Sequence, residues 1–157
     1  MIEFLLGGSK HTIYFITTGS NILADYADDL KAAGEFAATI RGKKRLQSRP
    51  DRPKDWKKFV AVLKKTVQHG YKMMAKTNAV KTWMEAGPNG EDIEVAEIRK
   101  GQLRVFFFED TCSAPGPPSR LILTHGYTKK TNSTPDGQTD CFINLRASYY
   151  TWLLSEE

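Results

Sequence analysis

One stretch of the chain reads Arg120-Leu-Ile-Leu-Thr-His-Gly-Tyr-Thr-Lys-Lys-Thr-Asn-Ser-Thr-Pro135. Its apolar start has the composition of a β-strand, and the strand pattern stops at His125-Gly126. Lys129 and Lys130 follow, and then a group of hydroxyl and amide side chains and a proline. We expect a strand that delivers an imidazole and two ammonium groups to its exit, an arrangement suited to a phosphate group.

Two further strands are expected just before this stretch. Residues 93–99 and 103–109 are rich in β-branched and aromatic side chains, and Lys100-Gly101-Gln102 predicts a tight hairpin between them. The loop 113–118 is too rich in proline for regular structure, and it leads to the third strand, 120–124. The three strands would form a meander that brings their ends together.

The first half of the chain predicts one strand and two helices. Residues 12–18 read as a strand. Apolar groups spaced three and four residues apart predict helices over 22–40 and 56–74. The connection 41–58 holds nine Lys/Arg against two Asp, a net of +7. It is either a solvated face or a surface for ribosomal RNA, and we expect two antiparallel helices joined by it.

A terminal helix is expected from about Pro135. Its apolar positions are Cys141, Phe142, Leu145, Tyr149, Trp152 and Leu153. The order of strand, two helices, three strands and helix predicts a single α+β domain over residues 1–157. One face of the sheet would pack against the helices and the other would stay open, which would suit RNA.

Composition and charge favour a basic protein of the cytoplasm. The formal net charge is +5 and the isoelectric point is about 9.2, which weakly favours an anionic partner. No apolar run approaches the ~20 residues of a membrane span, and the N-terminal sequence lacks the basic region of a signal peptide. Cys112 and Cys141 lack the spacing of metal ligands, and we interpret both as structural thiols.

Three segments together resemble a known toxin family. They are Glu97-Ile-Arg99, Leu103-Arg-Val-Phe-Phe-Phe108 and Leu121-Ile-Leu-Thr-His-Gly-Tyr-Thr-Lys-Lys-Thr-Asn-Ser-Thr-Pro135. They resemble the signature of phage-derived HigB-like toxins of the RelE/ParE superfamily, over roughly residues 93–150. The resemblance implies a RelE-like fold, which is a small, mostly antiparallel sheet with an N-terminal helical hairpin and a C-terminal helix.

The resemblance also implies a function. Such proteins are toxins of type II toxin–antitoxin pairs, and HigB- and RelE-like members cleave mRNA, commonly on the ribosome, without a metal or cofactor. A cognate antitoxin, often a helix-turn-helix protein, neutralises them. The chain departs from the family pattern in its long helical hairpin, in the enlarged loop 112–119 and in the Pro135-Asp-Gly-Gln start of its last helix.

Cleavage of RNA through its own 2′-hydroxyl requires proton transfer and stabilisation of the charged phosphorane. The residues that we expect to be catalytic are Arg104, His125, Lys130 and Tyr149. Those that we expect to bind RNA or phosphate are Arg99, Lys100, Lys129 and Arg146. Tyr150 is an alternative to Tyr149 for stacking on a base, and no metal site is expected.

Each of these residues also has a structural interpretation. Arg104 could solvate the end of its strand, His125 could bond to the backbone, and at least one of Tyr149 and Tyr150 should lie in the core. Two other functions therefore stay open. One is a ParE-like inhibitor that binds DNA gyrase without chemistry of its own, and the other is a phage-related homologue that binds a partner but is not toxic.

Overall fold

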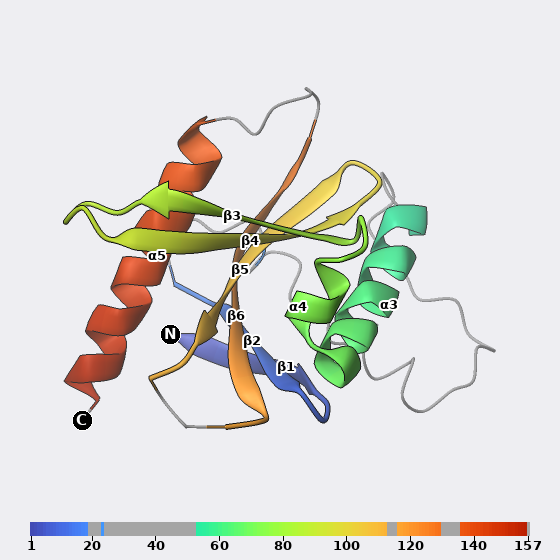
Figure 1. Cartoon of the computed structure of the whole chain (residues 1–157), viewed down its shortest axis with the longest axis horizontal. Helices are drawn as coiled ribbons and strands as arrows, with labels where there is room; N and C mark the ends of the chain where they lie inside the picture. Colours follow the sequence, from blue (N-terminus) through green and yellow to red (C-terminus); the bar gives the residue numbers. More distant parts are fainter. Residues whose placement is uncertain (19–22, 24–52, 113–115, 130–135, 157) are drawn as a thin grey trace.

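The chain folds into one mixed β-sheet with helices on both faces, in a computed structural model that describes residues 1–18, 23, 53–112, 116–129 and 136–156 (Figure 1). The strands are β1 (Ile2–Gly7), β2 (His11–Ile16), β3 (Val80–Ala86), β4 (Asp92–Lys100), β5 (Leu103–Asp110) and β6 (Ser119–Thr128). The described helices are α3 (Pro53–His69), α4 (Tyr71–Met74) and α5 (Asp136–Ser155). The α+β class and the C-terminal helix, both expected from the sequence, are confirmed.

The six strands lie in the order β1-β2-β6-β5-β4-β3. As expected, β4, β5 and β6 form an antiparallel meander. β2 runs parallel to β6, whereas the other neighbouring strands are antiparallel. The parallel pair makes neighbours of His11 and Ser119, which are 108 residues apart in sequence.

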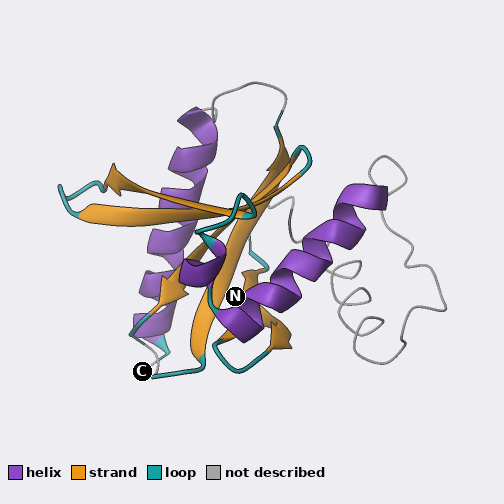
Figure 2. Ribbon diagram, turned by 45° about the vertical axis from the view of Figure 1, so that its right-hand side comes forward, coloured by secondary structure: helices purple, strands orange, loops and turns teal. Residues whose placement is uncertain are grey.

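Both faces of the central strands are buried, because side chains alternate along each strand and a hydrophobic cluster lies on each side of the sheet. On β5, Val105 and Phe107 belong to the hydrophobic cluster with α3 and α4, whereas Phe106 and Phe108 belong to the cluster with α5. Figure 2 shows α3 and α5 on opposite sides of the sheet. The expectation that one face stays open is therefore wrong, because α5 covers that face with Phe142 and its neighbours.

The chain begins with a β-hairpin, so the expected N-terminal helical hairpin is not seen. β1 pairs with β2 from Ile2↔Ile16 to Gly7↔Thr12. Sequence reasoning found the second of these strands but missed the first, whose side chains are mostly exposed or half-buried at the sheet edge. The first helix expected, 22–40, lies outside the described residues except for Leu23, which is buried in the cluster beneath α3. Most of the basic connection 41–58 also lies outside them.

Gly70 divides the second expected helix into α3 and α4. Its φ of 92° lies in the left-handed region that glycine adopts without a steric penalty. The Gly70 N–H donates to Thr66 O, and the chain then turns into the single turn of α4. The break directs the backbone N–H of Tyr71 to His11 on β2, which ties the helices to the N-terminal hairpin.

Gly8 is packed tightly against α3, and a side chain there should destabilise the fold. A Cβ atom at Gly8 would lie 2.7 Å from Val67 O and 2.8 Å from Val67 Cγ2. We expect Gly8→Ala to lower the free energy of unfolding by about 1–3 kcal/mol in urea denaturation, because the hairpin must move. Gly137→Ala on α5 is the matched control, since nothing lies within 4 Å of its Cβ position and alanine favours a helix. Equal stabilities of the two variants would contradict the close packing.

Candidate functional site

Four basic residues gather where β4, β5 and β6 meet at one end of the sheet. Arg99 pairs with Arg104 across β4 and β5, and Lys100 is the next residue at the hairpin. The Lys129 N–H donates to Gln102 O at 2.7 Å, which fixes the exit of β6 against the same turn. We call Arg99, Lys100, Arg104 and Lys129 the strand-end cluster. The sequence predicted this juxtaposition through the meander.

Arg104 lies inside the strand-end cluster and its side chain is buried. The guanidinium Nη1 donates to Gly101 O at 2.7 Å and to Leu103 O at 2.9 Å. Burial and the neighbouring charge of Arg99 lower the pKa of Arg104, whereas Glu97 opposes the shift. Arg104 therefore stabilises the hairpin through these two bonds, and its positive charge lies beneath the surface that Arg99 exposes. Arg99, with 32% of its side chain exposed, carries the charge that reaches solvent.

Glu97 is a buried carboxylate that sequence reasoning did not assign to the site. Its Oε1 lies 3.8 Å from the Nε atoms of both Arg99 and Arg104. Burial raises the pKa of Glu97, and the charges of Arg104, Arg99, Lys129 and Lys81 oppose the shift. The sequence could have predicted this contact. Glu97 and Arg99 are two residues apart on one strand and so share a face, and Arg104 lies opposite Arg99 on the next strand.

His125 lies beneath α5 and is almost fully buried. Its ring stacks on Phe106 with the centroids 4.9 Å apart. Its Nε2 lies 2.9 Å from Gln138 Oε1, and its Nδ1 lies 3.2 Å from Thr124 Oγ1. Burial lowers the pKa of His125, although the bond to Gln138 opposes the shift. These contacts fit a structural histidine that joins β6 to α5.

Tyr149 and Arg146 lie toward the other end of β5. Tyr149 is fully buried and donates a hydrogen bond to Asp110 Oδ2. Arg146 lies over aromatic rings, with its guanidinium carbon 5.0 Å from the ring centre of Tyr150 and 5.9 Å from that of Phe108. Phe108 is four residues along β5 from Arg104, roughly 13 Å away at about 3.3 Å per residue.

The predicted site residues therefore fall into separate groups. Arg99, Arg104 and Lys129 come together around Glu97, whereas Lys100 follows at the hairpin with its side chain on the other face of the strand. His125 is buried against Phe106 and Gln138, whereas Arg146 and Tyr149 belong to the packing between α5 and the far part of the sheet. Lys130 lies outside the described residues. Tyr150 is half-buried, and burial raises its pKa to about 12.

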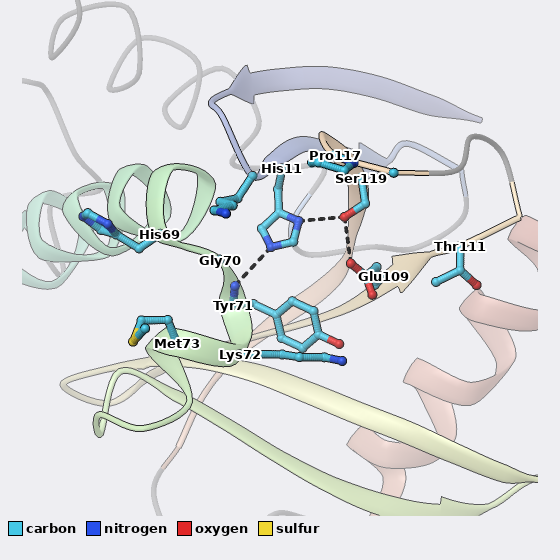
Figure 3. A pocket seen from close by; sticks show the side chains of 12 residues that line it. His11, His69, Gly70, Tyr71, Lys72, Met73, Glu109, Thr111, Pro117 and Ser119 are labelled. Carbon is cyan, nitrogen blue, oxygen red and sulfur yellow. Dashed lines mark hydrogen bonds between the residues drawn. The ribbon is translucent and has the colours of Figure 1, made fainter.

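A cavity of about 440 Å³ opens on the α3 and α4 face of the sheet (Figure 3). His11, Ser119, Glu109 and Tyr71 are among its lining residues, and the hydrogen bonds of His11 reach toward Tyr71 on one side and Ser119 on the other. Tyr71 Oη donates to Glu94 Oε1 at 2.7 Å. Ser119, His11 and a carboxylate in contact resemble the parts of a hydrolytic triad, so the direction of each hydrogen bond decides their role.

The hydrogen bonds at His11 run in the wrong direction for a nucleophilic serine. The Tyr71 N–H can only donate, so His11 Nε2 accepts from it at 3.1 Å. The ring proton is then on Nδ1, which donates to Ser119 Oγ at 2.8 Å, and Ser119 donates to Glu109 Oε2 at 2.7 Å. A catalytic histidine must accept the serine proton. The chain of bonds therefore joins β2, β5, β6 and α4 as a structural link.

The buried histidines predict how stability depends on pH. Burial lowers the pKa values of His11 and His125 below 6.5, so below that pH the unfolded state binds protons that the folded state does not. The free energy of unfolding should therefore fall as the pH drops below about 6.5 and level off above it. Urea denaturation across this range tests the sign, and His125→Gln should flatten the slope. A stability that rises on acidification would contradict the neutral, buried state of both rings.

No metal centre or membrane span is evident in the part of the chain that the structure describes. Within it, no three His, Cys, Asp or Glu side chains group as metal ligands would. None of its helices combines the length and the apolar character needed to cross a bilayer.

Comparison with known proteins does not assign the chain to a family. No family model matches the sequence, and no curated protein matches it either. A functional proposal therefore rests on the strand-end cluster and on the resemblance of residues 93–150.

Proposed function

We propose that the chain is the toxin of a type II toxin–antitoxin pair and an endoribonuclease that cleaves mRNA by attack of the 2′-hydroxyl. The observation that carries the proposal is the strand-end cluster. Arg99 of β4, Arg104 of β5 and Lys129 at the exit of β6 lie near Glu97 at one end of the sheet, Lys100 follows at the hairpin, and Arg99 is partly exposed there. Such a concentration of positive charge suits a phosphodiester, because charge-assisted bonds to phosphate are strong and guanidinium groups can bind it bidentately.

The roles within the cluster follow from exposure. Arg99 would contact a non-bridging oxygen of the scissile phosphate, and Lys129 would add a point charge at the exit of β6. Arg104 would act from behind, since its Nη1 is engaged with the hairpin carbonyls. Their combined positive charge would stabilise the phosphorane. Lys130 enters this proposal through the family signature alone.

His125 and Tyr149 are left out of the reacting groups because both are buried and hydrogen-bonded. Arg146 is left out because it lies over Tyr150 and Phe108. Catalysis would then depend on charge stabilisation and positioning more than on a buried acid–base pair. In this proposal the natural substrate is mRNA on the ribosome in the cytoplasm, and a helix-turn-helix antitoxin would neutralise the toxin.

A ParE-like inhibitor of DNA gyrase is the second candidate. The observation that favours it is the burial of His125 and Tyr149, which removes the two expected proton-transfer groups from the surface. A protein that acts only by binding needs no such groups. A non-toxic homologue that retains the fold and binds a partner is the third candidate.

Cell-free translation with added protein separates these functions. The endoribonuclease should cut the message at defined positions, and mapping of 5′ ends should locate the cuts. Intact messages with both wild type and Arg104→Ala would exclude the nuclease. DNA damage on expression, with intact messages, would favour the gyrase inhibitor, and normal growth would favour the non-toxic homologue.

A further inference from the structure

The environment of Glu97 is unusual for a strand residue. Glu97 is 1% exposed, yet it lies on β4 between the guanidinium groups of Arg99 and Arg104. Both N–O separations are 3.8 Å, which is longer than a hydrogen bond. Among the described residues, Glu97 Oε2 and the Nε atoms of both arginines are buried without a hydrogen-bond partner. One carboxylate oxygen and two guanidinium Nε atoms thus meet inside the protein without hydrogen bonds, although Arg104 Nη1 is bonded to the hairpin carbonyls.

Stability alone does not explain this arrangement. The attraction within a buried ion pair offsets the free-energy cost of desolvation only when its geometry is good and its remaining polar atoms are hydrogen-bonded. Here the separations are long and burial raises the pKa of the carboxyl despite two adjacent arginines. A catalytic role is one explanation of a buried polar atom without a hydrogen bond, because hydrogen bonds at catalytic sites are often long until the substrate binds.

We propose that Glu97 is a positioning residue, which orients the guanidinium of Arg99 toward the scissile phosphate. The inference rests on the proposed endoribonuclease function and adds a residue to it. Glu97 is too deeply buried to touch RNA, so it acts through Arg99, whose side chain bridges the interior and the surface. A fixed guanidinium loses less entropy when the transition state forms than a mobile one.

The test is a double-mutant cycle on RNA cleavage. Glu97→Gln keeps the shape of the side chain but removes its charge, so KM should stay near the wild-type value while kcat falls about 10–100-fold, as is typical for a partner one layer behind a reacting group. Arg99→Ala combined with Glu97→Gln should be no slower than Arg99→Ala alone, because Glu97 has then no guanidinium to position.

The substrate is a defined mRNA on purified ribosomes, and thermal unfolding checks each variant. If Glu97→Gln does not fold, Glu97→Asp replaces it in the same cycle, since it keeps the charge but shortens the reach. If the kcat of the double variant falls by the product of the two single effects, or if Glu97→Gln leaves kcat unchanged, Glu97 does not position Arg99. Neither result would contradict the nuclease activity itself. A wild-type protein that leaves the message intact would overturn both the nuclease and the inference.

Discussion

Replacing Arg99 with alanine is expected to slow mRNA cleavage about 100-fold, the usual cost of removing one group that stabilises charge in a transition state. Arg99 combines partial exposure with a place at the meeting point of β4, β5 and β6. Its loss would leave Lys100 and Lys129 at the surface, so RNA would still bind. The expected signature is therefore a fall in kcat that exceeds the rise in KM, measured by single-turnover cleavage of a ribosome-bound message.

Lys72→Ala is the matched control for Arg99→Ala. Lys72 is exposed on α4, across the sheet from α5, and its removal also takes one positive charge from the protein. A simple dependence on net charge would slow both variants equally. Equal rates in the two variants would therefore remove Arg99 from the proposed site.

Replacing Phe106 with alanine is expected to lower the free energy of unfolding by about 3–5 kcal/mol, which is typical of a large aromatic residue removed from a core. Phe106 is fully buried on β5. Its ring contacts those of His125, Tyr127, Phe142 and Trp83, at centroid distances of 4.9–6.1 Å. The substitution would leave an empty space between the sheet and α5, so the packing of α5 on the sheet should be strongly weakened.

Chemical denaturation followed by tryptophan fluorescence and by circular dichroism measures this loss. Met84→Ala is the control, because Met84 is more than half exposed on the edge strand β3, and a surface substitution should change stability by no more than about 0.5 kcal/mol. A Phe106→Ala protein as stable as Met84→Ala would mean that α5 does not pack on the sheet in the way described.

The meander could be predicted from the sequence because its signals are local. Dense runs of β-branched and aromatic residues mark β4, β5 and β6, and Gly101, with a φ of 58°, closes the hairpin between the first two. The edge strands β1 and β3 were missed because each is exposed along much of its length and makes only one ladder. Their position depends on distant partners, which no local pattern identifies.

The sequence contained a sign that the sheet is covered on both faces, although the prediction left one face open. The run Val105-Phe-Phe-Phe108 has apolar side chains at consecutive positions, which is typical of a strand covered on both sides. A half-exposed strand would alternate with polar residues. The predicted C-terminal helix supplies the second cover, and Phe142 packs directly on Phe106 and Phe108.

The sequence predicted which basic residues of the candidate site lie close together, but it did not predict which of the expected site residues are buried. Strand alternation and the hairpin bring Arg99, Arg104 and Lys129 together. The docking of α5 decides whether His125 and Tyr149 reach solvent, and it buries both. The apolar positions expected for α5 include Phe142 and Tyr149, and both are buried, but the sequence did not show that the helix covers the sheet face that carries His125.

Cleavage of a message with a single 2′-deoxynucleotide at the mapped cut site tests the central claim most directly. If the protein cleaves RNA by 2′-hydroxyl attack, the unmodified message is cut and leaves a 2′,3′-cyclic or 3′-phosphate end, whereas the deoxy-substituted message stays intact at that position. Arg99→Ala should cut the unmodified message at the same place but more slowly. Equal cleavage of both messages, or no cleavage of either by a protein that arrests growth, would contradict the proposed nuclease.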